Sequence, residues 1–393
     1  MKVLSINAGS SSLKFTLFEF PEKKELINGY FEKIGLEGSF YSIKKDGKKD
    51  VKEVVLNNHA EAVKILADEL FNYKVIESLD EIEGVGHRIV QGADKFDKSV
   101  LIDEDVIKTI DELSALAPLH NPAHIVGIRA FQEYLPNVPM VAVFDTAYHQ
   151  TMPKENYLYP VPMEWYEKYG VRKYGAHGTS HRFVYNELCD YLKKDNLKVI
   201  SCHIGSGASV TAIDSNKVLD TSMGFTPLAG VMMGTRCGDI DVSMIPYVMK
   251  HTGESIDEIL SDLNKKSGLL AISGVSSDNR DIENGAAEGN ERCALAQQMY
   301  SRKVADYIAK YNNLLNGSDA IILTAGLGEN AAIMRSLILE KIASLGVKID
   351  DSKNDFRGEF RLITADDSKI PVYVIPTNEE LLIASDTYDL INK

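Results

Sequence analysis

Apolar and polar residues at the start of the chain alternate in the pattern of a β-hairpin. Val3 to Ile6 is an apolar run, Asn7 to Ser12 is polar with one glycine, and Leu13 to Phe18 is apolar again. A short polar stretch between two such runs predicts a strand, a tight turn and a second strand. An ordinary surface hairpin is the alternative to a functional turn, because glycine and serine are common turn residues.

The same pattern returns about half a chain later. Apolar residues predict strands over Lys198–His203 and Val210–Ile213, and the stretch between them, Ile204 to Ser209, contains two glycines and two serines. Two similar hairpins at this separation are typical of a duplicated domain.

Helical and strand patterns alternate along the rest of the chain, which indicates an α/β protein. Pro118 ends one helix, and Asn121 is expected to cap the next. Tyr191 is expected to face inward, and 325–330 is expected to be a glycine turn between a strand and a helix. The predicted helices are 60–71, 103–116, 121–134, 180–192, 255–266, 291–315 and one from Asn378, and the predicted strands include 84–90, 138–144, 319–324 and 372–375.

After Asp145 the sequence becomes rich in loop signals, and prolines become frequent. This change predicts a domain boundary. We expect an N-terminal domain over 1–147, on which a closing helix over 381–393 packs, and a C-terminal domain over 148–380. Within the second domain, 224–241 is a long segment with four glycines and few helix or strand signals. Such a loop in a compact domain is usually functional.

Composition narrows the class of protein. Hydrophobic residues make up 44% and charged residues 25%, and the net charge of -14 argues against nucleic acid as a partner. No apolar run approaches the ~18 residues of a membrane span, and the N-terminus does not resemble a signal peptide. The four cysteines are widely spaced, which disfavours a zinc site or a disulfide framework. We therefore expect a cytoplasmic protein.

The two glycine-serine turns could cradle phosphate oxygens with backbone N–H groups and hydroxyls, and Lys14 adds a positive charge. Two such turns that face each other would suit a nucleotide. The chain has no G-x-x-x-x-G-K-[ST] motif, so it is not a Walker-type site. The strand and glycine turn over 319–330, with the helix expected after them, offer a helix N-terminus to an anion.

Several charged residues in predicted loops could serve phosphoryl transfer, which requires cations, a metal held by oxygen ligands and few covalent participants. Each also has a structural alternative: a histidine in a loop, an arginine in a surface ion pair, an aspartate as a cap, or a glutamate that favours a helix N-terminus. The candidates are Arg88, His120, Asp145, His177, Arg236, Glu379 and Glu380.

Taken together, the motifs resemble those of acetate kinases over nearly the whole chain. The matching runs are Asn7–Phe15, Gly86–Arg88, Ala117–Pro122, Phe144–His149, Tyr174–His181, Met232–Asp239, Gly326–Asn330 and Pro376–Glu380. The resemblance implies duplicated ribonuclease-H-like domains of the actin/hexokinase/sugar-kinase type with a cleft between them, the second domain binding the nucleotide. It also implies a homodimer, and reversible transfer of phosphate from ATP to acetate with Mg²⁺, for which Mn²⁺ could substitute.

The resemblance further implies roles for single residues. Arg88 and Arg236 would hold the carboxylate and the transferring phosphoryl group, His177 would stabilise the transition state and His120 would assist. Asp145 is the acid/base residue in family descriptions, but we expect it to orient acetate and Arg88, because a carboxylate nucleophile has no proton to lose. Asn7 and Glu379 would hold magnesium, with Glu380 as the next candidate. Lys14, Ser10, Ser12, His203, Ile204, Gly205, Ser206, Gly207, Asp278, Asn279, Arg280, Gly326, Leu327, Gly328, Glu329 and Asn330 would bind the nucleotide, and Val90, Leu119, Ala176 and Pro227 would surround the methyl group of acetate.

The chain departs from the family pattern at a few positions. Ser206 stands where Asn is usual, Gln91-Gly92-Ala93 where His-Gly-Gly is usual, and Ala229 where Glu is usual. Ala176 replaces an aromatic residue that helps to wall the methyl pocket. A wider pocket would admit propionate or butyrate unless a neighbour such as Trp165 fills the space.

Two alternatives therefore stay open. One is a propionate or short-chain acyl kinase of the same family, and the other is an actin-like ATPase that phosphorylates no small molecule. The sequence determines neither the acyl preference, nor the favoured direction, nor strict use of ATP.

Overall fold

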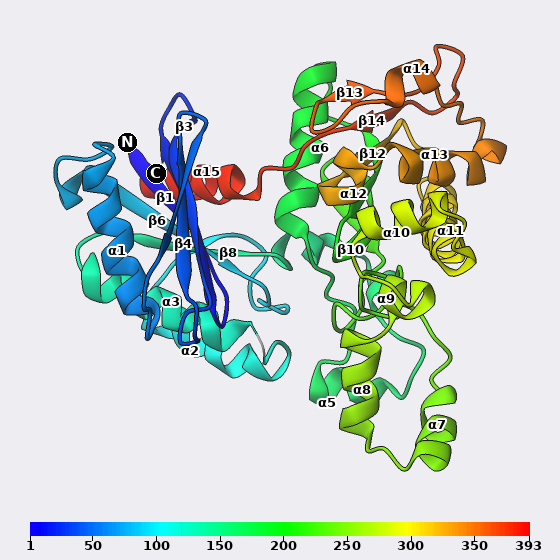
Figure 1. Ribbon diagram of the computed structural model, residues 1–393, viewed down its shortest axis with the longest axis horizontal. Coiled ribbons are helices and arrows are strands. Elements are labelled where there is room, and N and C mark those ends of the chain that lie inside the picture. The colour runs from blue at the N-terminus through cyan, green and yellow to red at the C-terminus, as the bar shows by residue number, and fades with distance from the viewer. Residues whose placement is uncertain (119) are drawn as a thin grey trace. The chain divides into compact units, whose positions relative to one another are not determined.

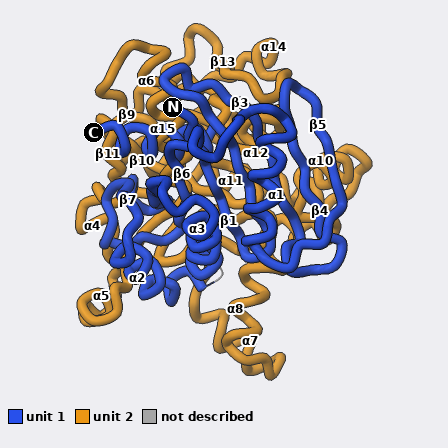
Figure 2. Tube along the Cα trace, turned by 90° about the vertical axis from the view of Figure 1, so that its left-hand side faces the viewer, with its two compact units in different colours: residues 1–148, 378–393 blue, residues 149–377 orange. Residues whose placement is uncertain are grey.

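The computed structural model describes residues 1–118 and 120–393, so Leu119 of the predicted methyl pocket lies outside the described residues. Contacts divide the chain into two compact units, shown in Figure 2. Unit 1 comprises 1–148 and 378–393, and unit 2 comprises 149–377. The closing helix thus belongs to unit 1, together with Asn378 at its start.

Unit 1 is built on an eight-stranded sheet in the order β5-β4-β3-β2-β1-β6-β8-β7. The predicted first hairpin is confirmed: β1 and β2 pair antiparallel, and on its other side β1 pairs parallel with β6. The strands are β1 (Lys2–Ala8), β2 (Ser12–Glu19), β3 (Lys24–Glu32), β4 (Phe40–Lys45), β5 (Lys48–Glu53), β6 (Ile82–Ile89), β7 (Val100–Leu101) and β8 (Met140–Phe144).

Helices cover both faces of this sheet (Figure 1). Alternate residues of β1 explain the division, because Leu4 and Ile6 pack with residues of α1 and α3, whereas Val3 packs with Ala384 of α15. Asn58 caps α1 by accepting a hydrogen bond from the Glu61 amide. The helices are α1 (His59–Asn72), α2 (Glu104–Glu112), α3 (Asn121–Tyr134) and α15 (Glu379–Ile391).

Unit 2 repeats the strand order of unit 1. Its six-stranded sheet runs β11-β10-β9-β12-β14-β13, which corresponds in order and direction to β3-β2-β1-β6-β8-β7. The predicted duplication of the α/β domain is therefore confirmed. The strands are β9 (Lys198–Ile204), β10 (Ala208–Asp214), β11 (Lys217–Thr221), β12 (Ala320–Thr324), β13 (Arg361–Leu362) and β14 (Val372–Val374).

The helices of unit 2 surround this sheet, and 224–241 forms the expected loop without helix or strand. They are α4 (Lys154–Tyr157), α5 (Met163–Tyr169), α6 (Gly178–Leu192), α7 (Met244–Thr252), α8 (Ile256–Lys265), α9 (Gly268–Ser273), α10 (Asn279–Ala287), α11 (Glu291–Leu314), α12 (Ala325–Asn330), α13 (Ala332–Lys341) and α14 (Asp351–Asn354). None of the helices in 1–118 and 120–393 is long and apolar enough to cross a membrane.

Four local predictions were wrong. Residues 325–330 form the short helix α12 and not an open turn, and α2 stops at Glu112 before a 3₁₀ turn. Tyr191 is exposed, and Tyr185 is the buried tyrosine of α6. Asn121 is the first helical residue and not the cap: its buried side chain bonds to Gln91 and to the Ile110 carbonyl instead.

Candidate active site

Arg88 and Asp145 form a buried ion pair at one end of the sheet of unit 1. Arg88 lies near the end of β6 and Asp145 follows β8, and the carboxyl ends of these adjacent parallel strands meet at one edge. Arg88 Nε donates to Asp145 Oδ1 at 3.0 Å, and Nη2 donates to Oδ2 at 2.7 Å. The side chain of Asp145 is 1% exposed and that of Arg88 21%. This two-point contact fixes the plane of the guanidinium.

The first residues of α15 bring two more carboxylates toward this edge. Glu379 lies 3.9 Å from Arg88 Nη2, and Glu380 forms an ion pair with Lys14. Burial alone would lower the pKa of Arg88, but the charges of Asp145 and Glu379 outweigh it and raise the pKa above its ordinary value. Arg88 is therefore a permanent cation that an anionic substrate can use.

Asn7 and Lys14 lie opposite each other in the β1–β2 register, so their side chains share one face of the sheet. Both line a pocket of about 350 Å³, to which Gly9, Ser12 and Glu32 also contribute. Ser10 and His120 are exposed, and His120 precedes α3. Val90 is half-buried.

In unit 2, Arg236 and His177 converge on the turn between β9 and β10. A Cβ placed on Gly207 would lie 3.4 Å from His177 Nε2 and 3.6 Å from Arg236 Nη2. Arg236 Nη1 donates to the Pro227 carbonyl at 3.0 Å, and among the described residues no carboxylate pairs with this guanidinium. Burial lowers the pKa of Arg236, which nevertheless stays cationic at neutral pH. A half-buried cation without a protein counter-ion is suited to bind an anion.

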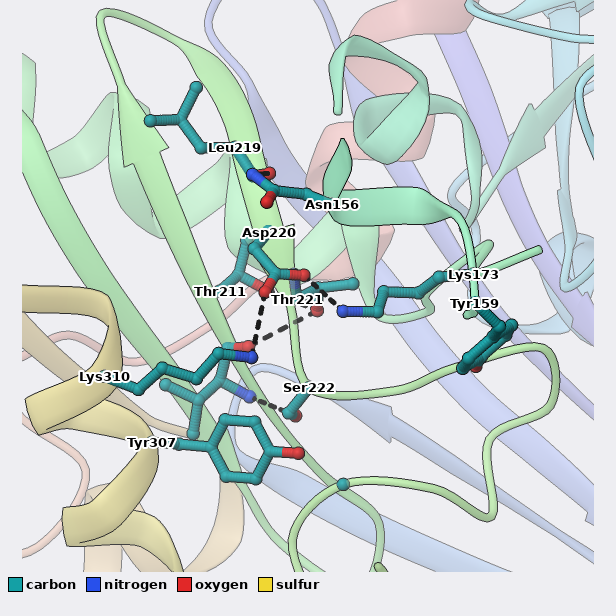
Figure 3. Close-up of polar contacts among 12 residues, drawn as sticks. Asn156, Tyr159, Lys173, Thr211, Leu219, Asp220, Thr221, Ser222, Tyr307 and Lys310 are labelled. Atoms are coloured by element: carbon teal, nitrogen blue, oxygen red, sulfur yellow. Dashed lines mark hydrogen bonds and ion pairs between the residues drawn. The ribbon is translucent and has the colours of Figure 1, made fainter. Parts of the chain in front are cut away.

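A polar cluster around Asp220, shown in Figure 3, holds in place the two segments of unit 2 that carry His177 and Arg236. The Asp220 carboxylate accepts from Lys173, which precedes the His177 segment, and from Lys310 of α11 at 3.1 Å. Tyr159 Oη accepts from the Phe225 amide at 2.8 Å at the start of the 224–241 loop. Later in this loop, Asp239 accepts from the Gly230 amide at 2.8 Å and from Tyr307 of α11 at 2.5 Å.

Unit 2 also contains a pocket, about 430 Å³ in volume, which lies beside the same turn. Most of its polar lining was predicted for the nucleotide. The predicted residues that line it are Gly205, Ser206, Asp278, Asn279, Arg280, Gly326, Leu327 and Asn330. Leu269, Ser277, Glu283, Ala331 and Arg357 also line it and were missed, since none lies in a glycine-rich motif.

Comparisons with known proteins bear on what these sites do. A model described as the acetokinase family matches residues 2–385. The chain belongs to the acetokinase family. An acetate kinase of Geobacillus kaustophilus (strain HTA426) is 53% identical over 393 residues, which cover 100% of this chain and 99% of that protein. An acetate kinase of Bacillus subtilis (strain 168) is 51% identical over 391 residues, covering 99% of each.

Solved structures of the acetokinase family superpose closely on the chain. A crystal structure of Porphyromonas gingivalis acetate kinase has a TM-score of 0.95, and one of a propionate kinase from Francisella tularensis subsp. tularensis SCHU S4 has 0.94. Each is 43% identical and covers 99% of both chains. These two structures alone do not separate the two acyl groups, whereas the relatives named above, which are more than 50% identical, are both acetate kinases.

Some residues predicted to bind nucleotide in this acetokinase have other contacts. Ile204 belongs to the hydrophobic core, Gly328 is buried and His203 Nδ1 bonds Ser180 Oγ at 2.8 Å. Glu329 Oε1 accepts from the amides of Ala325 and Thr377 at 2.8 and 3.0 Å, so it links α12 to the segment before α15. A nucleotide role for these residues stays a prediction.

The buried Arg335 holds two walls of this pocket together. Its guanidinium donates to the Gly328 carbonyl on α12 and to the carbonyls of Asn354 and Phe356, next to Arg357. Burial lowers the pKa of Arg335 to about 10. All of these bonds go to backbone carbonyls and none to a carboxylate. The acetokinase thus uses the Arg335 cation to fix the backbone around the pocket.

Proposed function

We propose that the chain is a Mg²⁺-dependent kinase that transfers the γ-phosphoryl group of ATP to acetate, reversibly, giving acetyl phosphate and ADP. The observation that carries the proposal is the convergence of Arg236 and His177 on Gly207, at a turn whose neighbours Gly205 and Ser206 line the pocket of about 430 Å³ in unit 2. The names of the relatives that are more than 50% identical support acetate as the acceptor.

In the proposed mechanism, Arg88 binds the acetate carboxylate and Asp145 orients Arg88. A carboxylate oxygen attacks the γ-phosphorus in line, the bond from phosphorus to the bridging oxygen of ADP breaks, and ADP leaves with the electron pair. Acetate has no proton to lose, so Asp145 need not act as a base. Arg236 and His177 offset charge on the equatorial oxygens, where positioned cations contribute most.

A magnesium ion would be held by Asn7 and Glu379, and it would neutralise charge on the phosphates of ATP. The oxygens of an amide and a carboxylate fit a hard cation, and magnesium usually takes one or two protein carboxylates. Among the described residues no group of three or more His, Cys, Asp and Glu could hold a metal, so protein ligands alone would not complete its shell. Glu379 lies beside Arg88 and Glu380 beside Lys14, so each carboxylate already pairs with a cation and Glu380 stays the second candidate.

The runner-up is a propionate or short-chain acyl kinase, because a structure named as a propionate kinase superposes on the chain about as well as one named as an acetate kinase. Ala176 bears on it, but its side chain is 5% exposed and belongs to the hydrophobic core of unit 2. Each added CH₂ that finds room would gain ~0.8 kcal/mol, close to fourfold in binding. Packed interiors rarely leave such room.

Trapping the acyl phosphate with hydroxylamine tests both proposals. We expect hydroxamate from acetate, and from propionate and butyrate at efficiencies closer to that of acetate if Ala176 leaves space. Ala176→Phe should then restore discrimination against the longer acids, and a thermal unfolding scan controls for overpacking. An unchanged acyl ranking would show that Ala176 does not set chain length. ADP release with no hydroxamate from any acid would favour the actin-like ATPase.

A homodimer is the assembly we propose, through one end of unit 2. Helix α7 has no buried residue and exposes Met244 and Tyr247, and α8 exposes Ile256 and Leu260. Figure 1 shows both helices at the same end of unit 2 as α5, which exposes Trp165. Short helices depend on tertiary packing, so α7 is best explained by contact with a second copy. The four free cysteines support a reducing, cytoplasmic location.

A further inference from the structure

One face of the sheet of unit 2 is buried and polar. Ser201 and His203 on β9 lie opposite Thr211 and Ser209 on β10, so all four side chains share a face. The other face of the same strands is apolar and forms the core. Because buried polar groups need partners, this face is expected to be hydrogen-bonded to the helix that covers it.

That helix is α6, which begins directly after His177 and carries His181 one turn later. Three contacts link it to the polar face in a single series. Ser201 Oγ lies 2.8 Å from His181 Nδ1, His181 Nε2 lies 2.7 Å from Ser209 Oγ, and Ser209 Oγ lies 2.9 Å from His177 Nδ1. The series connects a serine in the protein interior to the histidine proposed to stabilise the transition state.

The protons of this series can run in only two directions. Burial, with the nearby His149 and His203, lowers the pKa of His181 well below its ordinary value, so this ring is neutral and has one N–H. If His181 Nε2 donates to Ser209, then Nδ1 accepts from Ser201 and Ser209 donates to His177 Nδ1. If His181 Nδ1 donates to Ser201, every bond reverses.

Ser201 decides between the two directions. It is fully buried, and its hydroxyl has His181 as its one hydrogen-bond partner among the described residues. In the reversed series the Ser201 O–H would have no acceptor, which is more costly than an unused oxygen lone pair. The favoured series therefore runs from Ser201 O–H through His181 Nε2–H and Ser209 O–H to His177 Nδ1.

We propose that Ser201, His181 and Ser209 are positioning residues that hold His177 as the neutral tautomer with its proton on Nε2. Nε2 is the atom that faces Gly207 beside Arg236, and there an N–H donor stabilises the anionic phosphoryl oxygens, whereas a lone pair would repel them. This last step rests on the proposed kinase function, but the direction of the series does not.

Histidine tautomers can be measured directly in the resting protein. Long-range proton–nitrogen correlation spectra of ¹⁵N-histidine-labelled protein distinguish a protonated from an unprotonated ring nitrogen, and His177→Gln and His181→Gln assign the signals. We expect Nε2 protonated and Nδ1 unprotonated in both His177 and His181. A proton on His177 Nδ1 would overturn the proposal.

The far end of the series offers the sharpest variant. Ser201→Ala removes the hydroxyl that sets the direction, so the His177 signals should move toward a mixture of tautomers although Ser201 does not touch that ring. Thr211→Val is the matched control, because Thr211 lies directly opposite Ser201 on the same buried face but outside the series. It should leave the His177 signals unchanged. Unchanged His177 signals in Ser201→Ala would contradict the proposal.

Kinetics provide the second readout. Ser209→Ala should lower kcat about tenfold with little change in KM, since the lost contact acts on transition-state charge, and Ser209→Thr should restore kcat. An unchanged kcat in Ser209→Ala would overturn the positioning role. If the tautomers are as expected but the protein does not phosphorylate acetate, the kinase proposal fails and the series stands.

Discussion

The two arginines proposed to act on the substrates are held in opposite ways. Arg88 is locked by a two-point ion pair to Asp145, whereas Arg236 contacts a carbonyl and no described carboxylate. A locked cation serves to orient a small carboxylate. A cation without a counter-ion attracts an anion more strongly, which suits a phosphoryl group that carries several negative charges.

Arg88→Ala is expected to lower kcat by ~10³, the scale of arginines in phosphoryl transfer. It also removes the partner of the buried Asp145, which should destabilise the protein by about 3 kcal/mol. Adding Asp145→Ala should recover most of the stability and none of the activity. The measurements are denaturant unfolding and steady-state kinetics.

Arg129→Ala is the control for this prediction, because Arg129 forms an exposed ion pair with Glu104 in the same unit. It should change neither stability nor kcat appreciably. A near-native kcat in Arg88→Ala would remove Arg88 from the mechanism.

Gly207→Ala tests whether the space beside His177 and Arg236 is where the phosphoryl group lies. The added methyl group would make ordinary contacts of 3.4 and 3.6 Å with the two side chains, so the fold should tolerate it. We expect a thermal midpoint close to that of the wild type and kcat lowered more than tenfold. Gly205→Ala, in the same turn but lining the pocket of unit 2, should instead raise KM for ATP. Native kcat in Gly207→Ala would contradict this account of the turn.

Close packing of β6 against α15 explains why position 86 is a glycine. In the sequence, Gly86 was noted only as part of a motif. A Cβ on Gly86 of β6 would lie 2.3 Å from Thr387 Oγ1 and 2.7 Å from Ile383 Cγ2, both on α15. Because α15 begins at Glu379, this contact helps to place the proposed metal ligand. A side chain at position 86 would push the helix away from the sheet.

Gly86→Ala is therefore expected to destabilise unit 1 by about 1–3 kcal/mol, the usual cost of overpacking, and to raise the magnesium concentration needed for half-maximal activity. Thr387→Ala removes the nearest clash. The double variant should be more stable than the sum of the two single changes predicts, as for residues in contact. Strict additivity in denaturant unfolding would argue against this close packing.

Apolar periodicity predicted the hairpins and most helices, but it could not identify the polar face of β9 and β10. Ser201, Ser209 and Thr211 alternate with apolar residues, and the same alternation is typical of a strand with one exposed face. All three are fully buried: Ser201 and Ser209 bond His181 of α6, and Thr211 bonds Thr221 of β11. Only the tertiary contact distinguishes a buried polar face from an exposed one.

For the whole molecule, the duplication was visible in two turns, whereas the matching order of six strands was not. Strand order depends on pairing between distant segments, for which a single sequence carries no local signal. Leu269 and Arg357, which line the pocket of unit 2, were missed for the same reason, since they lie far along the chain from the glycine turns. Arg88, Asp145 and Arg236 are proposed from motif resemblance, because each candidate alone has an ordinary structural alternative.

The proposed dimer yields a prediction at this scale. Replacing both Met244 and Tyr247 with Glu on α7 should convert the protein to monomers in sedimentation experiments, because two charges would have to be buried. Leu295→Glu, at another exposed apolar position of unit 2, should leave the dimer intact. A wild-type protein that sediments as a monomer would contradict the proposal.

We expect phosphate from ATP to pass to a carboxylate and not to water. The most direct measurement compares ADP released from ATP with hydroxamate trapped, at increasing acetate concentration, in the wild type and in Arg236→Ala. We expect one hydroxamate per ADP, both dependent on acetate and magnesium, and both lowered by ~10³ in the variant. ADP release that is independent of acetate, or undiminished in Arg236→Ala, would contradict it.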